Sequence, residues 1–186
     1  MEEDAASGES GRHGRSGVVR VLCAVLLTVG LAAACGGESS ASDTPGAATV
    51  TRVVDGDTVR VDLDGARETV RLVGINTPET VAPDRPVECY GPEASAHLKE
   101  LLPDGTEVRL ERDVEARDRY GRLLAYVYRT DDDLFVNVDL VAGGYAQARS
   151  YPPNTTLESE LQAAQQQARS TGAGQWGACS PAQQPQ

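Results

Sequence analysis

Lysine, histidine and the large aromatic residues are scarce in this 186-residue sequence. It contains one Lys, two His, one Phe and one Trp, so nearly all of its positive charge is carried by arginine. The formal net charge is −11, which excludes a broad basic surface of the kind that binds nucleic acid non-specifically. A cleft can still be locally positive, and arginine suits bidentate contacts with phosphate. The length and a hydrophobic fraction of 40% favour one domain preceded by a leader.

The sequence also lacks long apolar runs, with one exception near the N-terminus. Residues 21–34 follow Arg12, Arg15 and Arg20 and carry no charge, which is the length of a signal-peptide core and too short for a membrane span. The run ends in Leu-Ala-Ala-Ala-Cys at residues 31–35, which resembles a bacterial lipoprotein signal with Cys35 as the lipidated residue. The alternative is an ordinary signal peptide cut after an Ala-x-Ala site. In both cases we expect an exported protein, either secreted or anchored to the cell membrane.

Further domain boundaries follow from composition. Residues 36–48 are rich in Gly, Ser and Ala and are predicted to form a flexible tether, followed by one domain over 49–178 and a short tail over 179–186. Cleavage at Cys35 leaves Cys89 and Cys179, and two cysteines in an exported domain favour one disulfide. The alternative is a pair of free thiols.

The pattern after the tether favours paired β-strands. Residues 49–54 alternate weakly, residues 58–63 alternate clearly, and Asp64-Gly65 is typical of a hairpin turn before a return strand at about 68–75. Antiparallel pairing then brings Asp57 close to the residues that follow the return strand. Further strands are expected over 106–111 and 123–128, and helices from Gly91, over 135–142 and from Thr155 to Gly172. Thr155 and Glu158 have the spacing of a capping box.

Oxygen-bearing side chains gather at the expected edge of this sheet. Asp57, Asn76 and Thr77 offer the hard oxygen ligands that calcium prefers, Arg71 is able to bind a phosphate, and Glu79 is able to orient a water molecule. The acids are not part of an EF-hand loop, because Val and Arg occupy its fifth and sixth positions. On spacing alone, the alternative is that these acids only occupy turns.

Three segments resemble the signatures of the thermonuclease (staphylococcal nuclease) family, in the same order and with similar spacing. They are VDGDT at 54–58, RLVGINTPET at 71–80 and YGR at 120–122. The resemblance extends from about Thr49 to Trp176. It implies an α+β, mainly β fold, with a five-stranded OB-type barrel and three helices. It also implies a monomeric enzyme that requires calcium and hydrolyses DNA and RNA, single-stranded or denatured substrate being favoured, to 3′-phosphate and 5′-hydroxyl ends.

The resemblance implies a role for each matching residue. Asp57, Asn76 and the carbonyl of Thr77 would bind calcium. Arg71 and Arg122 would bind the scissile phosphate and stabilise its transition-state charge. The remaining positions are Glu79, which would orient or deprotonate the attacking water, Arg119 and Tyr120, which would contact a terminal phosphate, and Tyr151, which would stack on a base.

Two positions depart from the family pattern. Asn76 stands where the family has a second aspartate ligand, so calcium affinity is expected to be lower. Arg149 replaces a tyrosine of the base-binding platform, which alters base preference. Two other classes of function are weighed against the nuclease. One is an OB-type module that binds nucleic acid without cutting it. Family relatives of this kind have lost the two arginines and the glutamate, which this chain keeps. The other is a calcium-stabilised exported module without a nucleic-acid role.

Overall fold

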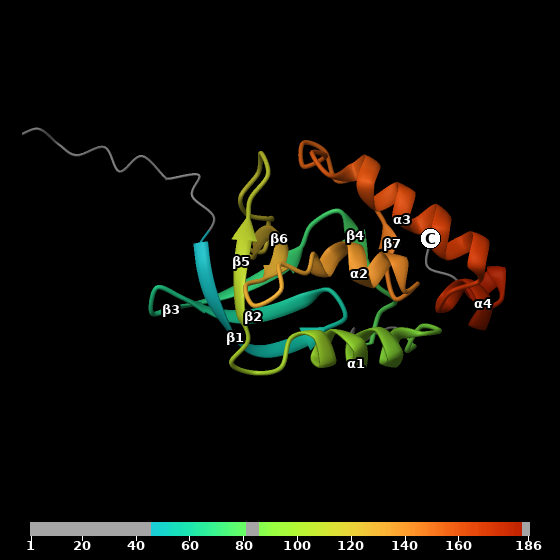
Figure 1. Ribbon diagram of the computed structural model, residues 1–186, viewed down its shortest axis with the longest axis horizontal. Helices are drawn as coiled ribbons and strands as arrows, with labels where there is room; N and C mark the ends of the chain where they lie inside the picture. Colours follow the sequence, from blue (N-terminus) through green and yellow to red (C-terminus); the bar gives the residue numbers. More distant parts are fainter. Residues whose placement is uncertain (1–45, 81–85, 184–186) are drawn as a thin grey trace, which may run out of the picture. The chain divides into compact units, whose positions relative to one another are not determined.

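The computed structural model describes residues 46–80 and 86–183 (Figure 1). The predicted signal peptide over 1–35, with Cys35, and the predicted tether up to residue 45 lie outside the described residues. Within the described part of the chain, no helix is long and apolar enough to cross a membrane.

A closed barrel of five strands forms the centre of the fold, with the strands in the order β1-β2-β3-β6-β5. Neighbours pair antiparallel except β3 and β6, which are parallel. Two short strands, β4 and β7, pair beside the barrel. The bounds are β1 (Gly46–Asp55), β2 (Thr58–Leu63), β3 (Ala66–Leu72), β4 (Ile75–Asn76), β5 (Glu107–Glu111), β6 (Leu123–Arg129) and β7 (Gln147–Ala148). The predicted five-stranded OB-type barrel is confirmed.

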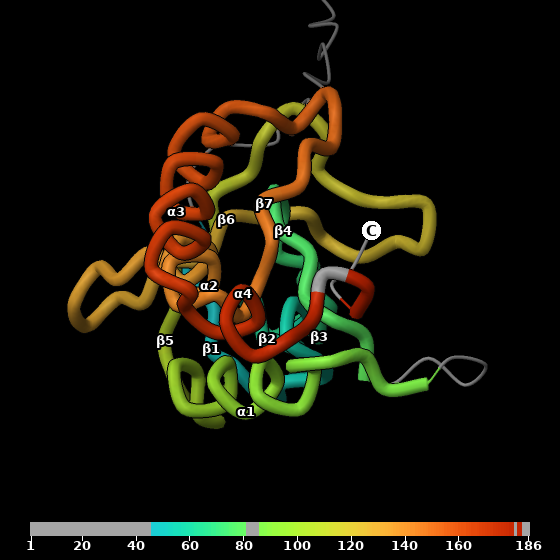
Figure 2. Tube along the Cα trace, turned by 90° about the vertical axis from the view of Figure 1, so that its right-hand side faces the viewer, coloured from blue at the N-terminus to red at the C-terminus, as the bar shows by residue number. Residues whose placement is uncertain are grey.

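Helices cover the barrel. The three predicted helices are α1 (Gly91–Leu101), α2 (Val136–Ala142) and α3 (Glu158–Thr171), followed by a short α4 (Gln175–Ala178) and a 3-10 turn, η1 (Pro181–Gln183). Figures 1 and 2 show α1 beside β1 and α3 running along α2. As predicted, α3 ends at Gly172, whose φ of 68° gives the left-handed cap that glycine favours.

Alternation along the strands fills the barrel with aliphatic side chains. Val59 and Val61 of β2, like Val70 and Leu72 of β3, are fully buried, so the residues between them point away from the core. Leu98, Leu140 and Leu161 bring one buried side chain each from α1, α2 and α3 into the same core. Because both strands must keep this register, the outward positions at 58, 60, 69 and 71 share one face of the sheet.

Two strand boundaries differ from the sequence prediction. β1 begins at Gly46 rather than Thr49, inside the predicted tether, because residues 46–49 pair with β5. The predicted return strand stops at Leu72, and Ile75 begins a separate strand that pairs with β7. Gly74 interrupts it with a φ of 78°. A Cβ at Gly74 would lie 2.5 Å from Cδ1 of Leu161, so glycine is also needed for α3 to approach.

The predicted capping box at the start of α3 is wrong. The helix begins at Glu158, and its N-cap residue Leu157 makes no side-chain cap bond. Thr155 accepts the N–H of Glu158 through its backbone carbonyl rather than its hydroxyl. The N–H of Leu157 donates to the hydroxyl of Tyr126 at 3.3 Å, and the N–H of Thr156 donates to Asp113 at 2.9 Å. Acceptors from distant parts of the chain therefore hold the two residues before the helix, and a backbone carbonyl serves the N–H of Glu158.

A disulfide joins Cys89, just before α1, to Cys179, just after α4, with a sequence separation of 90. The bond links the chain that follows the candidate site to the C-terminal end of the described domain. Such a long closed loop restricts the unfolded chain strongly.

We expect the Cys89→Ser/Cys179→Ser variant to lose about 4 kcal/mol of unfolding free energy, because a loop of this length lowers the entropy of the unfolded state. Urea unfolding with and without reductant measures the loss. Reductant should not change the unfolding free energy of the double variant, whereas it should lower that of wild type to the value of the variant. Equal stability of oxidised and reduced wild type would contradict the expectation.

Candidate active site

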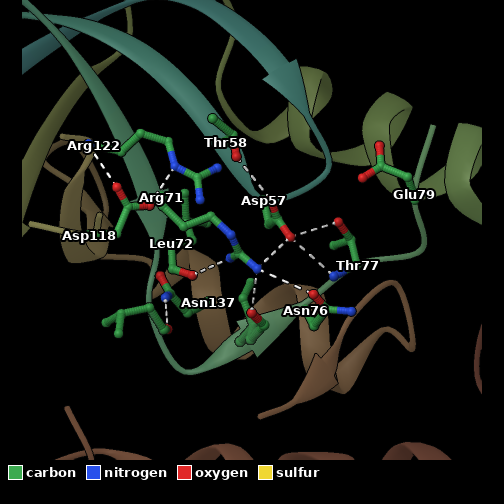
Figure 3. Close-up of polar contacts among 12 residues, drawn as sticks. Asp57, Thr58, Arg71, Leu72, Asn76, Thr77, Glu79, Asp118, Arg122 and Asn137 are labelled. Carbon is green, nitrogen blue, oxygen red and sulfur yellow. Dashed lines mark hydrogen bonds and ion pairs between the residues drawn. The ribbon is translucent and has the colours of Figure 1, made fainter. Parts of the chain in front are cut away.

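A buried ion pair lies at the centre of the site (Figure 3). Asp57 lies in the turn between β1 and β2, and its Oδ2 lies 2.9 Å from Nη2 of Arg71 on β3. The side chains are only 11% and 13% exposed, respectively. The register explains the contact, because Thr58 pairs directly with Arg71 across the two strands. A charge pair this buried requires further hydrogen bonds to offset its desolvation.

Those hydrogen bonds come from the backbone and from the other predicted site residues. Arg71 donates to the carbonyls of Leu72 at 2.6 Å and Ile75 at 3.0 Å. It also lies 3.4 Å from Oδ1 of Asn76. Oδ2 of Asp57 accepts from both the N–H and the hydroxyl of Thr77, at 3.2 and 3.1 Å. The structure therefore brings Asp57, Arg71, Asn76 and Thr77 into direct contact.

Close backbone approach makes this arrangement possible. A Cβ at Gly56 would lie 2.9 Å from Oγ1 of Thr77. Any larger residue at this turn would thus push the end of β4 away from Asp57. The hydroxyl of Thr58 donates to the other oxygen of Asp57 at 2.9 Å. Both carboxylate oxygens are held before any ligand binds.

Negative charge accumulates around the ion pair. Burial raises the pKa of Asp55, and the negative charges of Asp57 and Glu79 raise it further, although hydrogen bonds from Thr80 and the backbone oppose them. Glu79 itself lies on the opposite side of Asp57 from Arg122 (Figure 3). Several carboxylates thus share a small region with a single bound guanidinium, a surplus that a cation would relieve.

Glu79 is held by its own segment. Its carboxylate accepts the N–H of Thr80 at 3.0 Å. Its backbone N–H donates to Oε2 of Glu88, and its carbonyl accepts the N–H of Glu88, both at 2.9 Å. Because Cys89 of the disulfide follows Glu88 directly, this backbone contact of Glu79 lies beside a covalent cross-link.

The second arginine is positioned by a turn. Oδ2 of Asp118 accepts from Nε of Arg122 at 2.7 Å, and its Oδ1 accepts the backbone N–H groups of Tyr120 and Arg122 at 2.9 and 3.0 Å. Burial alone would raise the pKa of Asp118, but these hydrogen bonds and the charge of Arg122 outweigh it, so the pKa lies below its ordinary value. The terminal nitrogens of Arg122 make no hydrogen bond with the described residues and remain available for a ligand.

The two arginines face one cavity of about 610 Å³. Its lining includes Arg71, Arg119, Tyr120, Arg122 and Tyr151 and does not include Asp57, Asn76, Thr77 or Glu79. Arg71 is therefore the residue that joins the cavity to the carboxylates. The predicted phosphate-binding and stacking residues thus line the cavity, whereas the predicted calcium ligands and Glu79 do not.

Aromatic rings stand at the mouth of the cavity. Tyr120 is 69% and Tyr151 is 40% exposed. The guanidinium of Arg119 lies 4.8 Å from the ring centroid of Tyr120, and that of Arg122 lies 5.4 Å from it. Exposed rings flanked by arginines provide stacking surfaces for flat groups beside a phosphate site.

The donor chemistry of the site fits a hard divalent cation. Carboxylate and hydroxyl oxygens of Asp57 and Thr77 contact each other, and the guanidinium of Arg71 contacts both Asp57 and the amide oxygen of Asn76. The described residues contain no cluster of three His, Cys, Asp or Glu side chains arranged for metal binding. A bound cation would therefore depend on neutral oxygens as well as on carboxylates.

Three positioning residues were missed by sequence reasoning. Asp118 orients Arg122, Glu88 holds the backbone of Glu79, and Asn154 clasps the loop at Glu115 through bonds of 2.7 and 3.0 Å to its backbone. A signal existed for Asp118, since an Asp before a glycine turn often bonds the following N–H groups. The contacts of Glu88 and Asn154 cross loops and leave no local pattern.

Asp113 stabilises the loop that contains Glu115, a residue that lines the cavity. It accepts from the N–H and the hydroxyl of Thr156 at 2.9 and 2.8 Å and from the hydroxyl of Tyr126 at 2.9 Å. Burial raises the pKa of Asp113, but these bonds and one from Val114 lower it more, and the net pKa lies below its ordinary value. Burial raises the pKa of Tyr126 to about 12.

The fold and site together combine an OB-type barrel with a cavity that two arginines line beside buried carboxylates, an arrangement whose chemistry suits a phosphate group. Residues 69–178 match the family described as staphylococcal nuclease homologue. The chain belongs to the staphylococcal nuclease family.

Individual relatives cover the same region. The chain is 48% identical over 120 residues to the thermonuclease of Staphylococcus intermedius, covering 64% of this chain and 70% of that protein. It is 46% identical over 120 residues to the thermonuclease of Staphylococcus hyicus, with shares of 64% and 69%. It is 41% identical over 130 residues to endonuclease YncB of Bacillus subtilis (strain 168), with shares of 69% and 60%.

The lowered pKa of Asp113 predicts a pH-dependent contribution to stability. A carboxylate with a depressed folded pKa stabilises fully above its unfolded pKa, and this stabilisation is lost as pH falls through the folded value. We expect Asp113→Asn to cost about 1–2 kcal/mol at pH 7 and progressively less below the ordinary pKa of aspartate. Urea midpoints of both proteins over this pH range measure the difference. A difference in urea midpoint between the two proteins that stays constant with pH would contradict a lowered pKa of Asp113.

Proposed function

We propose that the chain is a calcium-dependent endonuclease that hydrolyses the phosphodiester bonds of DNA and RNA, leaving 3′-phosphate and 5′-hydroxyl ends. The observation that carries the proposal is that Arg71 and Arg122, from two separate strand regions, line one cavity while Arg71 also contacts Asp57. Thermonuclease and endonuclease relatives support the reaction class.

The arginines bind and stabilise charge. A scissile phosphate in the cavity accepts hydrogen bonds from the terminal nitrogens of Arg122 and lies beside the positive charge of Arg71. Charge that builds on the phosphoryl oxygens in the transition state is then met by fixed guanidinium groups, which require no reorganisation. Asp118 and Asp57 hold the two groups in place. Arg119 and Tyr120 contact a terminal phosphate.

Glu79 acts on the attacking water. Its carboxylate accepts a hydrogen bond from the water and takes its proton as oxygen attacks phosphorus. The bond from phosphorus to the 5′ oxygen breaks, and the 5′ oxygen gains a proton from solvent. This leaves the phosphate on the 3′ side. Glu88 fixes the backbone from which Glu79 reaches the reaction.

Asp57, Asn76 and the carbonyl of Thr77 would hold calcium. When bound, calcium supplies Lewis-acid polarisation of a phosphoryl oxygen and orientation of water. The surplus of negative charge around Asp55, Asp57 and Glu79 supports a cation here.

Substrate binding relies on stacking and phosphate contacts rather than on base edges. Tyr151 stacks on a base at the cavity mouth, and because every base has a π face this binding tolerates sequence. Such stacking requires unpaired bases, so single-stranded or denatured DNA and RNA are the favoured substrates. The chain acts as a monomer.

We also propose that the protein is exported. Residues 1–35 act as the signal, Cys35 carries the lipid anchor to the cell membrane, and residues 36–45 tether the domain. The support is the uncharged run over 21–34 and the small residues before Cys35.

Purified mature domain is expected to cut denatured DNA with calcium and not with a chelator. Glu79→Ala and Arg122→Ala should each lower the rate by a factor of about 100–1000 or more, because each removes an interaction with the reacting groups. Arg67→Ala, an exposed change on the strand of Arg71, is the matched control and should cut normally.

The outcomes separate the classes of function. Binding of denatured DNA without cutting by wild type would contradict the enzyme and indicate the non-catalytic OB-type module. Phosphate-analogue binding that Arg71→Ala and Arg122→Ala leave unchanged would exclude a nucleic-acid role altogether.

Asn76→Asp is expected to lower the calcium concentration for half-maximal activity by about tenfold, because it restores a charged oxygen ligand. Calcium titration of activity measures this, and the calcium-induced shift in melting temperature gives a readout independent of catalysis. An equal or higher calcium requirement in the variant would show that Asn76 does not limit affinity.

A further inference from the structure

Two arginines lie directly opposite each other on the outer face of the barrel. Arg52 on β1 pairs with Arg60 on β2, and both side chains are exposed. We call them the arginine pair. Like charges directly opposite on neighbouring strands destabilise a sheet. A function that uses the two charges would account for keeping them in this position.

A β-bulge creates the pair. Val50 pairs with Val61, so a regular register would place Thr51 opposite Arg60 and turn Arg52 toward the core. The register shifts between Val50 and Arg52 instead, which leaves Thr51 as the extra residue and brings Arg52 outward. Bulges beside functional sites commonly redirect a side chain in this way.

The surroundings do not neutralise the arginine pair. Among the described residues, neither arginine forms an ion pair, whereas Arg109, Arg117 and Arg129 each contact a carboxylate. The next outward row on the same face is balanced, because Asp62 pairs in register with Arg67. In a chain with a net charge of −11, solubility does not require uncompensated positive charge.

The arginine pair lies beside the candidate active site. Arg60 is opposite Thr69 on β3, and Arg71 is two residues further along on the same outward face. Diagonal neighbours of this kind are about 7–8 Å apart. Positive positions therefore continue from Arg71 through Arg60 to Arg52 across three strands that run side by side (Figure 1).

We propose that the arginine pair is a second phosphate-binding subsite, which holds a neighbouring phosphate of the single-stranded chain whose scissile phosphate lies at Arg71 and Arg122. The inference rests on the proposed function and extends it to longer substrates. The subsite contacts backbone phosphates and not bases, so it serves DNA and RNA alike.

Salt dependence of binding tests the subsite. Affinity of wild type, Arg52→Gln/Arg60→Gln and Arg67→Gln for a labelled single-stranded oligonucleotide is measured by fluorescence anisotropy over a range of salt, with chelator to prevent cutting. Each phosphate contact contributes about 0.7 to the slope of log K against log salt for single strands. The double variant, which loses one phosphate contact, should lose about 0.7 of slope and bind about tenfold more weakly at low salt. Arg67→Gln, the control from the balanced row, should keep the wild-type slope.

Two further readouts distinguish a subsite from a general effect. With calcium present, the double variant should show a raised KM for a long substrate relative to that for a dinucleotide. Its urea midpoint should equal or exceed that of wild type, since two opposed positive charges are removed. A wild-type salt slope in the double variant would overturn the proposal. If Arg71→Ala also left binding and cutting unchanged, the proposed function itself would be wrong.

Discussion

The contact between Asp57 and Arg71 is the constraint on which the rest of the site depends. Removing one partner of a buried ion pair costs about 3–5 kcal/mol because the other is left uncompensated. Here each partner also serves a different half of the site. Asp57 accepts hydrogen bonds from Thr77 and Thr58, whereas Arg71 donates to Asn76 and lines the cavity. A change at either residue therefore alters both the cation-binding oxygens and the phosphate cavity.

Charges of like sign are concentrated in two places, and each concentration works against folding. The charges of Asp57 and Glu79 repel that of Asp55 within the site, and Arg52 and Arg60 lie opposite each other on the outer face. In the proposed reaction both are relieved by ligands of the opposite sign, a cation for the acids and phosphates for the arginines. The unliganded fold is thus less stable than it could be, a common cost of a preformed site.

Local patterns predicted most of the fold. Alternation located β2, and Asp64-Gly65 located the hairpin, where both residues have positive φ as the turn requires. Predictions failed where a distant partner decides the outcome. β1 extends to Gly46 because residues 46–49 pair with β5. Before α3, the N–H groups of Thr156 and Leu157 donate to Asp113 and Tyr126, which are distant in sequence, and no capping box forms.

The candidate site divides in the same way. The residues that carry chemistry stand in short segments, and their resemblance to a family found them. The residues that hold the backbone of the site and of the cavity wall, such as Glu88 at Glu79 and Asn154 at Glu115, act through contacts across loops. These contacts are set by tertiary structure, and the order of residues in the chain gives no trace of them.

The disulfide has a consequence for a chain that has been cut. Asp57, Arg71 and Glu79 precede Cys89, whereas Arg122 and Tyr151 lie between the two bonded cysteines. One proteolytic nick between Cys89 and Arg122 would therefore separate the two halves of the site into different fragments that remain covalently joined. Tethered fragments reassemble at a high effective concentration rather than at that of the solution. The bond that stabilises the intact domain thereby also allows a nicked one to keep its site assembled.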